Sequence, residues 1–214
     1  MYEKFGQFIE GKWSPSENKE TYEVINPATE EVLGHASKAT SADVDRALKS
    51  AEKGLKVWKK TTPWNRSYIL RKIADRMREK KDVLAKWMTL ENGKPLAEGI
   101  GETNGAADIF EWNAEETKRI FGQTIESRFE DTRVHVYYQP VGVVAALSPW
   151  NFPLVLAARK ISTALAAGCS VIIKPDTITP GVVMELVDIC RECGVPPGAV
   201  NLLSGDPPSI ASQL

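Results

Sequence analysis

The segment SPWNFP at 148–153 has the residue types to stabilise a developing negative charge. Proline fixes its own φ and restricts the residue before it. Pro149 and Pro153 therefore hold Trp150 and Asn151 rigidly, between an apolar run and a helical pattern. The side-chain amide of Asn151 could donate a hydrogen bond to an oxyanion. Asparagine is also among the best helix N-caps, so the residues alone leave both roles open.

The cysteines are candidates for a thiolate nucleophile, but their sequence context predicts structural roles. Cys169 lies in the small-residue run AAGCSV at the start of an apolar strand, which is typical of packing. Cys190 and Cys193 form a C-x-x-C at the end of a helical pattern, with no second pair for zinc and no thioredoxin-like strand before it. His35 and His135 are far apart in the sequence, so we expect no metal site.

The charge balance and the hydropathy of the chain argue against nucleic acid and membranes as partners. The chain has 27 Lys and Arg against 28 Asp and Glu, so nothing favours nucleic acid or an anionic membrane surface. No apolar run reaches the length of a membrane span, and the N-terminus lacks the apolar stretch of a signal peptide. Few cysteines, odd in number, fit a reducing compartment, so we expect a cytoplasmic protein. The sequence has no metalloprotease, EF-hand, P-loop or nucleophile-elbow motif.

The C-terminal part predicts the elements that would position these residues. Three apolar strands alternate with two helices, which indicates a parallel sheet covered on both faces. Ligands of such sheets bind at the carboxyl ends of the strands, here 148–151, 174–177 and 204–206. Pro207 and Pro208 then lead into a segment that starts like a helix. Three strands alone would leave an open apolar edge, so we expect a fragment of a larger fold. The strands are 141–148, 170–175 and 198–205, and the helices are 152–168 and 181–193.

The N-terminal part predicts two hairpins, at 5–13 and 21–36, followed by helices. Apolar residues at three- and four-residue steps indicate an amphipathic helix over 41–58, which Thr40 or Ser41 can cap. Further helical patterns begin at Pro63, end at Asn92-Gly93 and resume over 97–121, and the alternating segment 131–139 predicts a strand.

The longest apolar and Pro-rich stretch, SPWNFPLVLAARKISTALAAGCSVIIKPDTITP, closely resembles the cofactor-domain signature of the aldehyde dehydrogenase superfamily. The resemblance extends through FIEGKW, VINPATEEV, TLENGKP and VPPGAVNLLSG, which together span essentially the whole chain. EWNAEETKRIFGQTI at 111–125 is most similar to the succinate-semialdehyde dehydrogenase branch. The implied fold is α/β, a partial doubly wound, Rossmann-like parallel sheet with an N-terminal hairpin and helical region.

The resemblance implies roles for particular positions. Asn151 matches the residue that forms the oxyanion hole together with the catalytic cysteine's backbone N–H. Ser148 and Trp150 fall at the cofactor-binding turn, where Trp150 matches a backbone contact to the cofactor. Lys174 matches a lysine that hydrogen-bonds the adenosine ribose, and Thr177 stands where NAD-preferring members often have glutamate. The family does not use a G-x-G-x-x-G loop, and none follows the first apolar strand here.

The identity of residue 177 bears on the choice between NADP and NAD. A carboxylate there would repel a 2′-phosphate, whereas a threonine hydroxyl can donate to one, so we expect NADP to be accepted. Thr177 as a cap of the next turn is the alternative. Arg159 lies eight residues after Asn151, and in the succinate-semialdehyde branch an arginine could hold the substrate carboxylate. A structural role for Arg159 is equally open, as it is for Lys160, which matches a lysine near the family's catalytic centre.

The resemblance divides the chain into three parts and assigns the chemistry to residues beyond them. Residues 1–127 would be the hairpins and helices of the cofactor domain, 128–140 a strand of an oligomerisation element, and 141–214 the first half of the NAD(P)-binding sheet. The catalytic cysteine and glutamate, and the catalytic domain, would lie beyond Leu214. We therefore expect a homo-oligomeric enzyme that acts on a small-molecule aldehyde. A non-catalytic chain that binds nucleotide or self-associates is the alternative.

Overall fold

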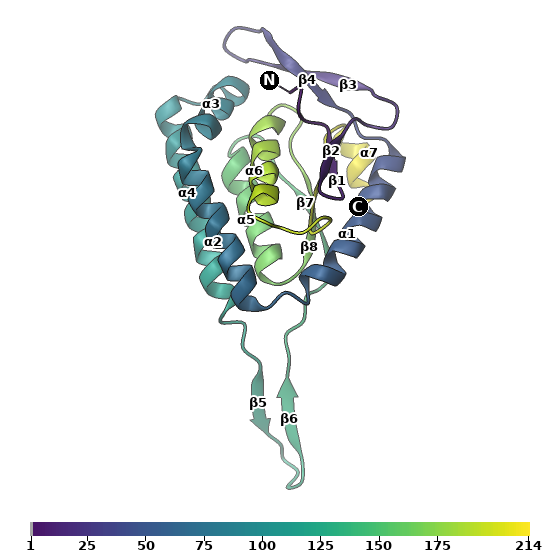
Figure 1. The fold of residues 1–214 in the computed structure, drawn as a ribbon, viewed down its shortest axis with the longest axis vertical. Coiled ribbons are helices and arrows are strands. Elements are labelled where there is room, and N and C mark those ends of the chain that lie inside the picture. The colour runs from purple at the N-terminus through teal and green to yellow at the C-terminus, as the bar shows by residue number, and fades with distance from the viewer. Residues whose placement is uncertain (1) are drawn as a thin grey trace.

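The computed structural model of the chain describes residues 2–214 and has four layers (Figure 1). A mixed sheet lies between helices α1 and α7 on one face and helices α5 and α6 on the other. Helices α2, α3 and α4 pack outside α5 and α6 and form the fourth layer. The helices are α1 Ser41–Trp58, α2 Pro63–Glu79, α3 Lys81–Asn92, α4 Leu96–Thr117, α5 Pro153–Ala166, α6 Pro180–Glu192 and α7 Pro207–Ala211.

The central sheet confirms the α/β class and adds one feature to it. Strands β7, β8 and β9 are parallel, with Leu147 opposite Lys174 and Ile173 opposite Leu202. The N-terminal hairpin β1–β2 continues this sheet, because β1 pairs antiparallel with β9, and the order is β2-β1-β9-β8-β7. Strand β1 therefore covers the third parallel strand, β9, and the open edge expected from the sequence lies at β7, the last strand in this order. The strands are β1 Gln7–Ile9, β2 Lys12–Ser14, β7 Val143–Leu147, β8 Ser170–Lys174 and β9 Val200–Leu202.

Strand β8 shows why the sheet needs helices on both faces. All five of its residues are buried, as expected for a parallel strand between two layers. Val171 and Ile173 pack into the large core shared with α5, α6 and the outer helices. Ile172 points to the opposite face, into a smaller cluster with Val44 of α1 and Ile210 of α7. The near-continuous apolar character of these strands follows from this double burial.

Helix α1 has the limits that its periodicity predicts. Thr40 is the N-cap, and its hydroxyl accepts the N–H of Asp43 while Asp43 accepts the N–H of Thr40. This reciprocal capping box satisfies two of the helix's free donors. At the other end Trp58 is fully buried, and its Nε1 donates to the carbonyl of Leu165 at 2.8 Å. The N-terminus of α1 is thus fixed by its own capping box, and its C-terminus is hydrogen-bonded to the last turn of α5.

A long two-stranded hairpin projects from the body (Figure 1). Its second strand, β6 Arg133–Val136, lies within the segment predicted as a strand. Its first strand, β5 Gln123–Glu126, was not predicted, because all four of its residues are exposed and no apolar alternation marks it. Between β2 and α1, a separate hairpin pairs β3 Thr21–Ile25 with β4 Val32–Ser37, as expected. No helix within residues 2–214 combines the length and the apolarity needed to cross a membrane.

Helix α1 approaches the sheet so closely that one position requires glycine. A Cβ built on Gly54 would lie 2.0 Å from the carbonyl carbon of Gly198, in the loop that enters β9. Gly101 in the second turn of α4 is the opposite case, because no atom other than the backbone of its own helix lies within 4 Å of its added Cβ. The two glycines have equivalent helical backbones but very different surroundings.

We therefore expect Gly54→Ala and Gly101→Ala to change stability in opposite directions. Gly54→Ala must force α1 away from the sheet, which should lower the free energy of unfolding by about 2 kcal/mol or more. Gly101→Ala should raise it by up to about 1 kcal/mol, because alanine has the better helix propensity. Urea unfolding of both variants measures the two effects. A gain in stability for Gly54→Ala would contradict the close packing of α1 on the loop before β9.

Candidate functional site

The carboxyl ends of the three parallel strands meet at one edge of the sheet, as the sequence predicts. Leu147 and Lys174 are in register, and the N–H of Ser148 donates to the carbonyl of Lys174 at 3.0 Å. The segments 148–152 and 174–177 are therefore neighbours, and the turn after β9 lies beyond them along the same edge. Asn151, Lys174 and Thr177 are brought to one side of the molecule.

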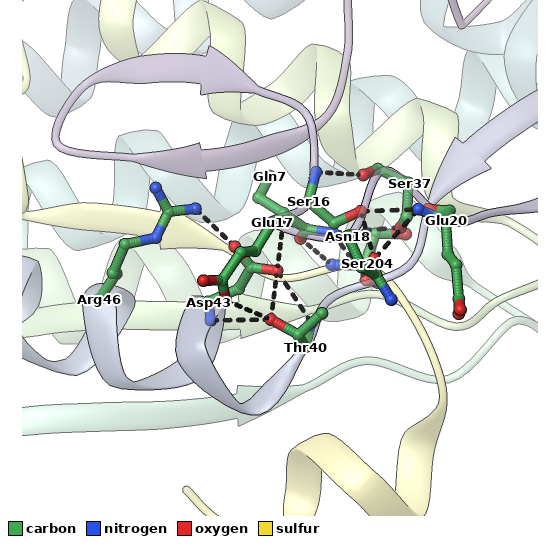
Figure 2. A network of polar contacts seen from close by, with 10 residues as sticks. All are labelled: Gln7, Ser16, Glu17, Asn18, Glu20, Ser37, Thr40, Asp43, Arg46 and Ser204. Atoms are coloured by element: carbon green, nitrogen blue, oxygen red, sulfur yellow. Dashed lines mark hydrogen bonds and ion pairs between the residues drawn. The ribbon is translucent and has the colours of Figure 1, made fainter.

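The turn after β9 is held by a glutamine from β1 (Figure 2). The side chain of Gln7 is fully buried and accepts the N–H of Ser204 at 2.8 Å. Its amide donates to the carbonyls of Ser204 and Ser37, at 3.0 and 3.1 Å. The hydroxyl of Ser204 also lies 2.7 Å from that of Tyr22. The hairpin β1–β2 therefore holds the turn after β9, which is the third turn at the carboxyl edge of the sheet, in place.

Asn151 does not cap helix α5. The N-cap of this helix is Phe152, and no side chain of its own segment bonds its first turn. Asn151 is exposed, and its backbone carbonyl accepts from Nζ of Lys94 at 3.3 Å. The structure thus contradicts the capping alternative and leaves the amide of Asn151 available at the strand's carboxyl end.

A buried glutamate from α4 caps α5 instead. Oε1 of Glu102 accepts the N–H groups of Leu154 and Val155, at 2.9 and 3.1 Å. Its Oε2 pairs with the ammonium of Lys94, and the Glu102 side chain is 2% exposed. The carboxylate therefore satisfies two free donors of α5 and interacts favourably with the helix dipole.

Helix α6 begins on a second buried glutamate. Oε1 of Glu91, in α3, accepts the N–H of Gly181 at 2.8 Å, and Oε2 accepts that of Val182 at 3.3 Å. The hydroxyl of Tyr2 also donates to Oε1. Burial raises the pKa of Glu91 to about 8, against the lowering effect of the two N–H groups. The first N–H groups of both crossover helices of the sheet are thus bound by glutamate side chains from the outer helical layer.

Lys174 and Thr177 are positioned differently at the end of β8. Lys174 is 4% exposed, and its Nζ donates to the carbonyl of Pro175 at 2.8 Å. Burial lowers the pKa of Lys174, while nearby Asp176 and Asp206 oppose that shift. Asp176 accepts the N–H of Ile178, so it forms the turn that was the alternative role of Thr177. Thr177 is half-buried and Ile178 is exposed.

The remaining predicted site residues lie at the start of α5 or along it. Ser148 is buried, and its hydroxyl donates to the carbonyl of Pro153 at 3.4 Å. Trp150 is about half exposed, and its carbonyl accepts from Nδ2 of Asn92 at 3.1 Å. Arg159 is exposed and Lys160 is half-buried.

A cleft runs beside the first turns of α5, between this helix and α4. It has a volume of about 340 Å³, and its α5 wall consists of Phe152 and Val155. Arg159 follows Val155 by four residues and Phe152 by seven, so the three share one face of α5. The α4 wall and the loop before it contribute Lys94, Glu98, Gly101, Glu102 and Gly105.

The three cysteines are all free, all buried and all away from this edge. Cys169 precedes β8 and lies at the amino end of the sheet, one strand length from Lys174. Cys190 is in the last turn of α6 and Cys193 is its C-cap. Burial raises the pKa of both Cys190 and Cys193, which disfavours a thiolate. Within residues 2–214 no cluster of His, Cys, Asp and Glu side chains could hold a metal ion.

Comparison with known proteins decides the family, because the sequence profile of the Aldehyde dehydrogenase family matches residues 13–214. The chain belongs to the aldehyde dehydrogenase family. It is 42% identical to glutarate-semialdehyde dehydrogenase of Pseudomonas putida over 97% of the chain and 43% of that protein. It is 41% identical to succinate-semialdehyde dehydrogenase [NADP(+)] of Escherichia coli, over 96% of the chain and 43% of that protein.

Solved structures agree with the family assignment. The crystal structure of succinate-semialdehyde dehydrogenase from Burkholderia pseudomallei superposes with a TM-score of 0.96 at 39% identity, over 98% of this chain and 43% of that one. The resemblance and the fold class stated from the sequence are thereby confirmed. The chain spans less than half the length of the curated relatives it matches.

Sequence reasoning missed the two capping glutamates of this aldehyde dehydrogenase chain. A cap that comes from about 50 or 90 residues away leaves no signature at the helix start it serves. One signal was available, since both acids interrupt buried helical stripes. Glu91 falls in line with Leu84 and Met88 on α3, and Glu102 with Ala106 and Phe110 on α4.

Glu91 predicts a specific pH dependence of stability. Its pKa is raised from 4.5 to about 8 in the folded chain, so between these values the folded state holds a proton that the unfolded state has released. The stability contributed by this group is complete below pH 4.5 and is lost as pH rises through 8. Each unit of the shift corresponds to about 1.4 kcal/mol.

Urea unfolding at pH 5.5 and at pH 8.5 measures this effect. Compared with the wild type, Glu91→Gln should lose less stability between the two pH values, because its amide still accepts N–H groups but does not titrate. Glu98→Gln is the matched control, since Glu98 is exposed on the neighbouring helix and should leave the wild-type pH dependence in place. Equal pH dependence in all three proteins would rule out titration of Glu91 in this range.

Proposed function

We propose that the protein carrying residues 1–214 oxidises an aldehyde to a carboxylic acid with NADP+ or NAD+, and that the aldehyde bears a carboxylate at its other end. The observation that carries this proposal is the free amide of Asn151 at the sheet edge that also holds Lys174 and Thr177. The names of the two similar proteins, succinate- and glutarate-semialdehyde dehydrogenase, support the substrate class.

The residues at this edge fit the binding of a dinucleotide. Lys174 uses one of its three donors on Pro175, so two remain for ribose hydroxyls. Thr177 adds a hydroxyl, and the carbonyl of Trp150 has a second lone pair beside the one that Asn92 occupies. When bound, the nicotinamide group would supply the hydride acceptor. Asn151 would donate a hydrogen bond from its side-chain amide to the substrate oxygen and stabilise the negative charge that develops there.

The nucleophile must come from residues other than those described here. Aldehyde oxidation through a covalent thiohemiacetal needs a thiolate beside the oxyanion donor. Cys169 lies at the opposite end of β8 from the site, and burial keeps Cys190 and Cys193 as thiols. We therefore propose that residues 1–214 contribute oxyanion stabilisation and cofactor binding but do not catalyse the oxidation by themselves.

Arg159 supports a substrate with a distal carboxylate. Arg159 follows Pro153, the first residue of α5, by six residues, which corresponds to about 9 Å of helix rise beyond the segment that carries Asn151. Helical side chains lean toward the N-terminus, so the Arg159 side chain would lean toward the preceding turn, which contains Val155. No acidic side chain within residues 2–214 forms an ion pair with Arg159. A guanidinium without a carboxylate partner, at the end of a face lined by Phe152 and Val155, suits a short aldehyde with an anionic tail.

The proposal is tested with the complete natural protein, with succinate semialdehyde and butanal as substrates. Arg159→Leu should lower kcat/KM for succinate semialdehyde by about 10- to 100-fold, as expected for loss of a charge-assisted contact. It should leave butanal oxidation nearly unchanged, which provides an internal control for folding. The 214-residue chain should form no NADPH with either aldehyde. Equal losses for the two aldehydes would reject Arg159 as the carboxylate contact, and no oxidation by the complete protein would reject the function.

We also propose that NADP+ is accepted at this edge. Thr177 presents a neutral hydroxyl where a glutamate would repel the 2′-phosphate, and the name of the Escherichia coli relative includes NADP(+). Lys174 adds positive charge close by, while Asp176 on the same turn reduces it.

Thr177→Glu should weaken NADP+ binding by about tenfold or more and change NAD+ binding much less, because only the first ligand carries the 2′-phosphate. Tryptophan fluorescence titration with each dinucleotide measures both constants. Thr177→Gln is the matched control, since it adds similar bulk without charge and should retain most of the NADP+ affinity. Equal weakening by glutamate and glutamine would indicate a steric effect and overturn the electrostatic assignment.

A further inference from the structure

Side chains from α3, α4 and the loop between them hold the corner that carries Asn151. The amide of Asn92 donates to the carbonyl of Trp150 at 3.1 Å. Nζ of Lys94 donates to the carbonyl of Asn151 at 3.3 Å and lies 4.1 Å from the centre of the Phe152 ring. The backbone before and after the Asn151 side chain is therefore fixed from outside the sheet.

The Glu102 carboxylate completes this arrangement from α4. One of its oxygens receives the first N–H groups of α5, and the other pairs with Lys94. Both side chains are nearly buried, with 8% of Lys94 and 2% of Glu102 exposed. A buried carboxylate without its cation would be strongly destabilised, so the two residues act as a unit. This unit links the helix that follows Asn151 to the carbonyl of Asn151 itself.

We propose that Glu102 and Lys94 are positioning residues for Asn151, with the catalytic part of this inference resting on the proposed function. The side-chain amide of Asn151 does not cap α5, so the orientation of this side chain depends on the backbone at 150–154. Glu102 fixes the first turn of α5, and Lys94 fixes the Asn151 carbonyl. Oxyanion stabilisation requires a donor that is already in place when the charge develops, and small displacements of such a donor are costly.

A double variant without either charge separates a positioning role from a purely stabilising one. If the ion pair only stabilised the fold, recovery of stability would also restore Asn151. Replacing a buried pair by neutral side chains of similar volume is often close to neutral for stability. The double variant Glu102→Gln/Lys94→Met keeps an acceptor for Leu154 and Val155 but removes the donor to the Asn151 carbonyl. We therefore expect it to restore most of the stability that Glu102→Gln loses, without restoring the position of Asn151.

The ¹H–¹⁵N spectrum of the 214-residue chain tests this without any turnover. The side-chain NH2 signals of Asn151 are assigned by their loss in Asn151→Asp. In Glu102→Ala, the amide protons of Leu154 and Val155 should exchange at least about tenfold faster, and the Asn151 NH2 signals should shift or broaden. Glu98→Gln, one turn earlier on α4 and in the same cleft, should change neither. If the alanine variant does not fold, Glu102→Gln replaces it in this test. It should shift the Asn151 NH2 signals, while the amide protons of Leu154 and Val155 remain protected from exchange.

The effect of Glu102 on catalysis is measured as kcat and KM of the complete protein. Glu102→Gln should lower kcat by about tenfold or more and change the KM for NADP+ much less, because Lys174 and Thr177 are not displaced and Asn92 still holds the carbonyl of Trp150. The double variant should keep the low kcat despite its recovered stability. Unchanged Asn151 signals in the Glu102 variants, or recovery of kcat together with stability in the double variant, would overturn the positioning role. Absence of any oxidation by the wild type would reject the proposed function while the spectra still decide the inference.

Discussion

The buried carboxyl groups of Glu102 and Glu91 set the geometry on which the rest of the structure depends. Each accepts N–H groups at the start of one crossover helix, and each belongs to a helix of the outer layer. In most dinucleotide-binding sheets the first helix N-terminus receives the pyrophosphate through a glycine-rich turn. Here a side-chain carboxyl group of the protein already accepts the first N–H groups of α5 and of α6. The absence of G-x-G-x-x-G follows physically, because neither helix start is free to take a phosphate.

This use of carboxylates connects the helical layer to function. Helices α3 and α4 belong to the outer layer and are separated from the sheet by α5 and α6. Their glutamates nevertheless fix where α5 and α6 begin at the carboxyl edge of the sheet. The opposite end of α5 is also fixed, since Trp58 and Thr117 donate to the carbonyls of Leu165 and Ala166. Side chains from distant elements thus satisfy free backbone groups at both ends of one helix.

Local signals in the sequence predicted the elements well. The period of the apolar residues defined α1, and Thr40 was available as its cap because a capping box is encoded within four residues. The alternation of apolar strands and helices predicted the parallel strands β7, β8 and β9. The exposed strand β5 gave no such pattern, because a hairpin that leaves the body buries neither face. The pairing of β1 with β9 is also absent from local patterns, since Phe8 and Leu202 are far apart in the chain.

The sequence predicts which residues lie at the carboxyl edge of the sheet, but it does not predict their contacts. The rule that the carboxyl ends of parallel strands share one sheet edge predicted that the segments at 148–151 and 174–177 are neighbours, as the structure shows. The choice between oxyanion donor and N-cap for Asn151 could not be made from the sequence, because the true cap, Glu102, comes from another helix. Burial of Lys174 and Ser148 depends on three-dimensional packing, so their partners Pro175 and Pro153 had no signature either.

Anchoring α5 at both ends has a consequence for specificity under the proposed function. Asn151 lies two residues before the first residue of this helix and Arg159 lies in its second turn, so their separation depends on the helix rise of about 1.5 Å per residue and on the fixed backbone at 151–153. A loop-borne arginine could adapt to substrates of several lengths, whereas an arginine on a fixed helix cannot move relative to the oxyanion donor. The distance between the aldehyde and the distal carboxylate would then be selected by a rigid element. The same side chains that satisfy the ends of α5 would therefore contribute to the choice of substrate, although none of them contacts it.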